Sequence, residues 1–286
     1  MKSKINLILF ISAFLAACNF TGGQSNLEKY NFRSKNVQRN ILPWQLNEVS
    51  GLAVSKDNKL YCHDDENGVI YQININTGSI IKRFQLGSFG IDADFEGMAI
   101  AGKNFYIVTS DGILYKFREG NNLAKVQVKE IDLGFSSKFE IEGLCYDKST
   151  NSLLLASKGY PGKQYKGKRT IYSYSLSENK LIKTPRIQIS LKELQKRFGI
   201  KQFHPSAIEI NPLTGTYFVL SAKGNRAIIE ISKSGKILNG IKLNKKLHRQ
   251  PEGLTFLKDG TMIISDEAAG KRATLTKYNL LKTEAH

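Results

Sequence analysis

A short motif returns along this chain of 286 residues at almost constant intervals. Each copy has a small residue, with Glu or Ser before it and an apolar run after it. The small residues are Gly51, Gly97, Gly143, Ala207 and Gly253, and three of the four intervals between them are 46 residues. Repetition at a fixed period is the sequence signature of repeat architectures, so the motif divides the chain into five similar units.

Each unit consists of short apolar runs separated by turn residues. In the second unit these runs are "DFEGMAIA", "KNFYIVTS", "GILYKFR" and "KVQVKEIDL". Runs rich in β-branched and aromatic residues, with Gly, Asn, Asp and Ser between them, indicate β-strands joined by tight turns. Four strands in about 45 residues are typical of one β-propeller blade. The sequence therefore predicts an all-β fold, a five-bladed β-propeller with four-stranded blades over residues 29–286.

Two departures from the repeat predict further features of the fold. The fifth unit lacks a fourth strand of its own, and the segment "KYNFRSKNVQRNIL" before the first motif can supply it. Such a closure removes an exposed sheet edge. The longer interval, between the third and fourth motifs, contains "SLKELQKRFGI", in which Ser190 and Glu193 form a capping box. We therefore expect a short inserted helix near residues 190–199.

The residues just before the small residues form a candidate metal site. In a propeller the innermost strand of each blade lines a central channel, and its first residues lie at one mouth. Three carboxylates at that mouth would repel one another, and a cation would neutralise them. Oxygen ligands favour calcium, and the sequence offers no clustered Cys or His for zinc. The predicted ligands are Glu96, Glu142 and Glu252, with Ser50, Ser206, Asp64 and Asp266 as weaker candidates.

A purely structural role remains an alternative for each of these residues. Any single Glu could cap a turn or pair with a neighbouring lysine. The pairs Asp64–Asp65 and Asp266–Glu267 come at the ends of second strands, where carboxylates are commonly solvated. Glu48 and His63 are weaker candidates still, because a lone His is more often structural.

The N-terminus resembles a bacterial lipoprotein signal. A basic start and an apolar run of thirteen residues lead to "LAAC", which resembles a lipobox ending at Cys18. We predict a signal peptide over residues 1–18, lipidation of Cys18 and a flexible tether over 19–28. The protein would then be exported and anchored to the cell envelope, at the outer membrane rather than the inner one where both exist. An ordinary signal peptide that contains a cysteine is the alternative. Cys62 and Cys145 lie in apolar runs and are predicted to be buried thiols.

The chain is strongly basic, with 42 Lys and Arg against 25 Asp and Glu. Such a surface suits an anionic membrane or a small anionic molecule, and an envelope protein is a further candidate partner. A solvated surface without a ligand is an equal alternative, and nucleic acid is not expected outside the cytoplasm. The densest basic run is "KGYPGKQYKGKR", and its candidate anion-binding residues are Lys163, Lys166, Lys168 and Arg169.

Several segments resemble one family of bacterial propellers. These segments are "FHPSAIEINPLTGTYFVLSAKGNRAIIEIS", "DFEGMAI", "EIEGLCYD" and "QPEGLTFLKDGTMIISDE", behind a lipobox. They resemble the SdiA-regulated family over about residues 40–280, and more distantly the esterase-like phytase, lactonase and NHL-type propellers. The resemblance implies five blades, an exported location and a calcium site in or near the channel. Ala207 in place of the motif glycine, and Ser50 and Ser206 in place of Glu, depart from a complete carboxylate ring.

Together these patterns predict a membrane-anchored, calcium-binding propeller that recognises an extracytoplasmic ligand or partner. The alternative is a metal-dependent hydrolase of the lactonase or phosphoesterase type, in which a cation at the channel mouth activates water. Glu142 or Glu252 could then act as base, although the sequence contains no GxSxG motif and does not identify catalytic residues. A third interpretation is a scaffold in which the cation only holds the ring together.

Overall fold

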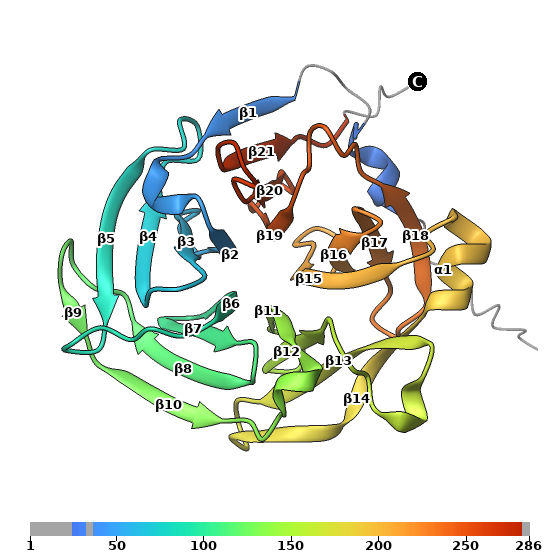
Figure 1. The fold of residues 1–286 in the computed structure, drawn as a ribbon, viewed down its shortest axis with the longest axis horizontal. Helices are drawn as coiled ribbons and strands as arrows, with labels where there is room; N and C mark the ends of the chain where they lie inside the picture. The colour runs from blue at the N-terminus through green and yellow to red at the C-terminus, as the bar shows by residue number, and fades with distance from the viewer. Residues whose placement is uncertain (1–24, 33–36, 282–286) are drawn as a thin grey trace, which may run out of the picture.

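The computed structural model describes residues 25–32 and 37–281. Five antiparallel sheets surround a central channel, and each sheet runs outward from an inner strand (Figure 1). This architecture is the predicted five-bladed β-propeller with four-stranded blades. The predicted signal peptide and Cys18 lie outside the described residues.

The strands follow one another from the channel outward in blades 1 to 4. Blade 1 comprises β2 (Val49–Val54), β3 (Leu60–Asp64), β4 (Val69–Ile73) and β5 (Ile80–Leu86). Blade 2 comprises β6 (Phe95–Ala101), β7 (Asn104–Thr109), β8 (Ile113–Arg118) and β10 (Val128–Asp132). Blade 3 comprises β11 (Ile141–Asp147), β12 (Ser152–Ser157), β13 (Lys168–Ser175) and β14 (Lys180–Ser190). Blade 4 comprises β15 (Phe203–Ile210), β16 (Tyr217–Gly224), β17 (Ala227–Ile231) and β18 (Ile237–Lys242). A short strand, β9 (Lys125–Val126), extends blade 1 by pairing in parallel with β5.

Blade 5 closes the ring with a strand from the N-terminal part of the chain. Its own strands are β19 (Pro251–Phe256), β20 (Met262–Asp266) and β21 (Thr274–Tyr278). The fourth strand is β1 (Gln38–Ile41), which pairs antiparallel with β21 through Arg39 and Thr276 (Figure 1). The closure predicted from the sequence is therefore confirmed.

Residues 25–32, which precede β1 in the sequence, pack against blades 4 and 5. Leu27, in a short 3-10 turn (Leu27–Lys29), is fully buried. One carboxylate oxygen of Glu230, Oε2, accepts hydrogen bonds from Ser25 Oγ at 2.8 Å and from the backbone N–H groups of Asn26 at 2.7 Å and Leu27 at 2.9 Å. Residues 25–28 were predicted to belong to a flexible tether, and instead they belong to the folded domain because Glu230 and the core bind them.

The predicted helix is α1 (Leu191–Phe198), on the outside of the ring beside β18 (Figure 1). Ser190 Oγ accepts a hydrogen bond from the Glu193 N–H at 3.2 Å, as a capping box requires. Gly199 ends the helix with a φ of 66°, in the left-handed region that glycine adopts without strain. Of the helix side chains, Leu194 is buried in the core.

Apolar side chains fill the spaces between neighbouring blades. One cluster joins blades 3 and 4 through residues such as Leu154, Ile171, Ile208 and Tyr217. Cys62 and Cys145 are free and fully buried, and burial raises the pKa of both thiols. Within the described ranges, no helix is both long enough and apolar enough to cross a membrane.

Candidate functional site at the channel mouth

Every inner strand begins with a β-bulge, and the bulge falls on the repeat motif. The register with the second strand shifts at the start of all five inner strands. The shifts lie at Val49/Leu52, Phe95/Met98, Ile141/Gly143, Pro205/Ala207 and Pro251/Gly253. A bulge bends a strand and changes the direction of a side chain. The residues that it affects here form what we call the bulge ring: Ser50, Glu96, Glu142, Ser206 and Glu252.

The small residue after each bulge position lets neighbouring blades approach closely. A Cβ atom added at Gly97 would lie 2.5 Å from Leu144 N and 2.7 Å from Glu142 O in the next blade. Real Cβ atoms do not come so close to backbone atoms, so a side chain larger than hydrogen does not fit at Gly97. The motif glycine is therefore needed because inner strands crowd at this mouth.

The structure brings the three predicted glutamates together. Glu142 and Glu252 are buried, with exposed fractions of 4% and 7%, and both line a cavity of about 10 Å³ inside the channel. Burial, and then the charges of Glu142 and Glu252, raise the pKa of Glu96 to about 11. Burial likewise raises the pKa of Glu142 and of Glu252. Three carboxylates in this environment require a compensating cation or protons.

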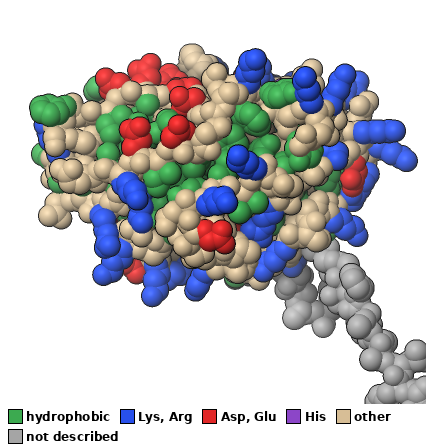
Figure 2. Space-filling view, turned by 90° about the horizontal axis from the view of Figure 1, so that it is seen from below, with side chains coloured by type: hydrophobic (Ala, Val, Ile, Leu, Met, Phe, Trp, Pro, Cys, Tyr) green, Lys and Arg blue, Asp and Glu red, His purple; other side chains and the backbone are tan. Residues whose placement is uncertain are grey.

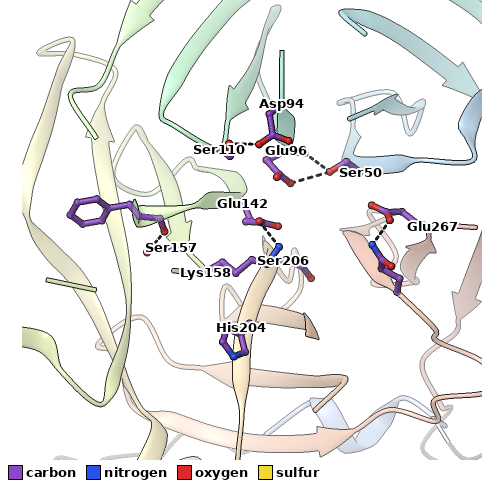
Figure 3. Close-up of polar contacts among 12 residues, drawn as sticks. Ser50, Asp94, Glu96, Ser110, Glu142, Ser157, Lys158, His204, Ser206 and Glu267 are labelled. Atoms are coloured by element: carbon purple, nitrogen blue, oxygen red, sulfur yellow. Dashed lines mark hydrogen bonds and ion pairs between the residues drawn. The ribbon is translucent and has the colours of Figure 1, made fainter. Parts of the chain in front are cut away.

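Lys158 supplies one such cation; it begins the basic run of the sequence analysis but was not named there as a site residue. Its Nζ lies 2.6 Å from Glu142 Oε1 (Figure 3). The charges of Glu142, Glu252 and Glu96 raise the pKa of Lys158 despite its partial burial, which acts in the opposite direction. Glu142 is thus neutralised by the protein itself, whereas Glu252 Oε2 is buried without a hydrogen-bond partner among the described residues.

Lys158 belongs to a second ring, which we call the strand-end ring. In each blade one residue of the second strand pairs with the residue just before the bulge. These pairs are Val49–Asp64, Phe95–Thr109, Ile141–Ser157, Pro205–Ser221 and Pro251–Asp266. The strand-end ring consists of the next residues along the second strands: Asp65, Ser110, Lys158, Ala222 and Glu267. The same repeat spacing that reveals the bulge ring therefore also locates Lys158.

A tight acidic cluster lies where blade 5 meets blade 1. Carboxylate oxygens of Glu48, Asp65 and Glu267 all lie within 4.8 Å of one another. Among the described residues, no other group of three or more His, Cys, Asp or Glu ligand atoms is this close. Burial and then the Glu48 carboxylate raise the pKa of Asp65 to about 6 and that of Glu267 to about 8. Asp65 Oδ1 is buried without a hydrogen-bond partner among the described residues.

The weaker metal candidates of the sequence analysis have structural partners. Asp64 Oδ1 caps a turn by accepting hydrogen bonds from the backbone N–H groups of Glu66 and Asn67, and Asp266 Oδ2 lies 2.8 Å from His248 Nδ1. Ser50 Oγ donates to Glu96 O at 3.1 Å, and Ser206 Oγ donates to Pro251 O at 2.8 Å. His63 is buried too, and its Nε2 accepts a hydrogen bond from the Gly51 N–H at 3.1 Å.

The basic residues predicted to bind an anion differ in their surroundings. Lys163 and Lys166 are exposed, and Lys168 Nζ donates to Gln188 Oε1 at 2.6 Å. Arg169 reaches the mouth, where its guanidinium donates to Phe203 O at 2.7 Å and contacts His204 Nδ1 at 3.0 Å. Burial and then the Arg169 charge lower the pKa of His204. Figure 2 shows Lys and Arg side chains distributed over the visible face.

Comparison with known proteins supports the fold and one family. Among solved structures, the chain is similar to the glutaminyl cyclase of Myxococcus xanthus, with a TM-score of 0.60, 11% identity and coverage of 85% of this chain and 95% of that chain. It is also similar to virginiamycin B lyase from Staphylococcus aureus, with a TM-score of 0.44, 15% identity and coverage of 83% and 69%. None of the curated proteins matches the chain. At such low identities the structural similarity shows the propeller fold alone. The predicted resemblance is confirmed for the last third of the chain: residues 179–284, from β14 through blade 5, match the family model described as SdiA-regulated.

Proposed function

We propose that the protein is an exported, lipid-anchored β-propeller that binds calcium at its channel mouth and recognises an extracytoplasmic ligand there. The observation that carries the cation site is the acidic cluster of Glu48, Asp65 and Glu267. Calcium binds oxygen ligands at about 2.3–2.6 Å, so two oxygens on the same ion lie at most about 5 Å apart. The separations in the cluster, all within 4.8 Å, fit that limit without rearrangement.

A second, independent observation favours a cation on this side of the mouth. Glu252 is more than nine-tenths buried, and its unpartnered Oε2 lies in the bulge ring beside the strand that carries Glu267. The Glu267 charge raises the pKa of Glu252, which places the two carboxylates within electrostatic reach. Lys158 already neutralises Glu142, one of the three predicted ligands. The negative charge that still lacks a partner therefore lies nearer to blades 5 and 1. We therefore propose Glu48, Asp65 and Glu267 as the calcium ligands, with Glu252 adding negative charge.

The anchor is proposed from the signal-like N-terminus and its lipobox at Cys18. The folded domain begins by Ser25, so a short segment separates the proposed lipid from the propeller. Mass spectrometry of the membrane fraction tests the anchor directly. A diacylated Cys18 at the mature N-terminus would support it, whereas cleavage elsewhere without lipid would refute it.

Thermal unfolding of the purified protein, first freed of metal and then titrated with calcium, tests the cation site. A ligand that binds only the native state raises the midpoint, by the equivalent of about 2.7 kcal/mol at one hundred times its Kd. We expect such a rise in the wild type and its loss in Glu267→Gln and Asp65→Asn. Asp94→Asn is the matched control, because Asp94 is an exposed carboxylate of the same mouth that is hydrogen-bonded to Ser110. The site would be rejected if calcium, magnesium and manganese all left the midpoint unchanged.

One observation favours the metal-dependent hydrolase as a second candidate. Glu48 is exposed, so a cation held by this cluster would face solvent on that side and could bind water. Calcium-dependent turnover of a lactone or phosphate ester, lost in Glu267→Gln, would support hydrolysis. Binding of such compounds without turnover would leave ligand recognition as the function.

A further inference from the structure

A cavity of about 360 Å³ opens beside the bulge ring, between blades 3, 4 and 5. Its polar lining comprises Lys158, Lys223, Arg226, Gln250 and Glu252. This volume lies at the lower end of the range for small-molecule sites. The cavity differs from the predicted basic loop, which contributes only Lys158 to it.

Two of the lining cations have no partner for their charged ends. Among the residues that the structure describes, Lys223 Nζ and the terminal nitrogens of Arg226 make no hydrogen bond or ion pair. Arg226 Nε donates to Arg249 O at 2.9 Å, which fixes the plane of the guanidinium while leaving the terminal nitrogens available. A fixed guanidinium beside an ammonium is well suited to bind a carboxylate or phosphate group.

The positive charges of Lys223 and Lys158, which line the cavity, also affect His204 nearby. Besides burial, the charges of Arg169, Lys223 and Lys158 all lower the pKa of His204. His204 is therefore harder to protonate than a free imidazole, because these three cations all contribute positive potential around it. An anion entering here would be attracted by several side chains at once.

The lining also includes a buried carboxylate oxygen that has no hydrogen-bond partner. Glu252 lines this cavity, is 7% exposed, and its Oε2 has no hydrogen-bond partner within the described part of the chain. A buried polar atom without a partner costs about 1–3 kcal/mol, so a ligand that donates a hydrogen bond to it gains affinity. Gln250, also in the lining, donates to Glu267 and so connects the cavity with the acidic cluster.

We propose that this cavity binds a small organic anion that carries a hydrogen-bond donor, a hydroxyl or ammonium group, beside its carboxylate or phosphate group. Lys223 and Arg226 bind the anionic group, and Glu252 accepts the hydrogen bond from the donor. The inference rests on the proposed function, since it names the class of ligand that the mouth recognises. It does not require calcium to be bound.

The test compares three probes that share a carboxylate and differ only in the neighbouring group: acetate, glycolate and glycine. Their binding to the full-length protein is measured by titration of the thermal midpoint at constant ionic strength, with sodium chloride as the baseline. Glycolate or glycine should bind about tenfold more tightly than acetate, because only they can donate to Glu252. Inorganic phosphate and glycerol phosphate, compared in the same way, show whether a phosphate group replaces the carboxylate.

Three variants separate the contributions. Lys223→Met with Arg226→Met should weaken binding of every probe, by about tenfold or more. Glu252→Met, which removes both acceptor oxygens, should remove the advantage of glycolate or glycine while acetate binding persists. Lys163→Met with Lys166→Met is the matched control, because it removes two exposed lysines from the same face without touching the cavity.

The outcomes also separate this inference from the calcium site. The titrations are repeated in EDTA, and unchanged selectivity there would support the anion site even if calcium did not bind. Equal binding of the three carboxylates, or binding that survives loss of Lys223 and Arg226, would overturn the inference whatever the calcium result.

Discussion

The two ends of the central channel are formed by the same five inner strands, yet they differ in almost every respect. At the mouth described above, each strand is bulged and directs a polar residue to the ring. At the far end the strands keep a regular register, and a cavity of about 170 Å³ is lined by apolar residues such as Ala53, Ile100, Ile210 and Phe256. The polar residues of the mouth lie at the bulges, where a bulge can change the direction of a side chain, whereas Glu209 and Thr255 at the far end lie in regular strands.

A carboxylate lies at each end, and the two differ in their hydrogen bonds. Glu209 at the far end is satisfied locally, because its oxygens accept hydrogen bonds from Ile210 N at 2.8 Å and Thr255 Oγ1 at 3.4 Å. Glu252 at the mouth has an oxygen with no partner among the described residues. The far-end carboxylate is therefore satisfied by the protein itself, whereas the oxygen of Glu252 at the mouth is not.

The largest effect is expected from Gly97→Ala at the bulged end. The added methyl group would meet Leu144 N and Glu142 O, and we expect a loss of about 3 kcal/mol or more in the free energy of unfolding. Ala207→Gly is the control at the same motif position of blade 4 and should cost only about 1 kcal/mol. Urea unfolding measures both, and similar costs would contradict the close approach of blades 2 and 3.

A smaller effect is expected from Lys158→Met, which removes the cation beside Glu142. We expect a loss of about 2–3 kcal/mol, because an almost fully buried carboxylate loses its ion-pair partner. Adding Glu142→Gln should recover most of that loss in the same urea experiment. If the double variant is as unstable as the single one, the packing of the lysine stem matters more than its charge.

The last effect is expected from Glu209→Gln at the far end; it is negligible at low pH and grows as pH rises. Burial raises the pKa of Glu209 to about 7, above its ordinary value of 4.5. Its contribution to stability is therefore complete below pH 4.5 and is lost as pH rises through about 7. The Gln variant should match the wild type near pH 4.5 and be more stable by about 3 kcal/mol at pH 8, since the shift of the pKa is worth about 1.4 kcal/mol per unit. The mouth glutamates titrate in the wild type and in the variant alike, so they cancel in the comparison. If the difference in the free energy of unfolding between the two proteins does not change with pH, the raised pKa is wrongly assigned to Glu209.

The fold could be predicted because the sequence motif repeats along the chain. One motif at a constant interval gave the number of blades, and the missing strand of the fifth unit required β1. Ser190 and Glu193 placed α1, since a capping box is a local signal that tertiary packing seldom overrides. The boundary between the tether and the folded domain could not be predicted from local sequence, because the partner of Ser25 and Leu27 is Glu230, some two hundred residues away.

The candidate site was predicted only in part. The motif identified the bulge ring, but the strand-end ring has a different residue in every blade, so it leaves no motif. Asp64 and Asp266 were named as candidates, whereas the acidic cluster uses the next residues, Asp65 and Glu267. Alternate residues of a strand point to opposite faces, so one position decides whether a carboxylate caps a turn or reaches the cluster.

The binding of the N-terminal segment by Glu230 determines how the propeller would stand on a membrane. Glu230 pairs across its sheet with Phe218, which pairs with Glu209, so Ser25 is held near the apolar end of the channel. Seven residues lead from Cys18 to Ser25, and an extended chain of that length spans about 25 Å. If Cys18 carries lipid as proposed, Ser25 lies within about 25 Å of the bilayer, which favours an orientation with the far end towards the bilayer and the bulged mouth away from it. A ligand would then arrive by diffusion through the aqueous compartment, and the anchor would hold the domain without obstructing its entrance.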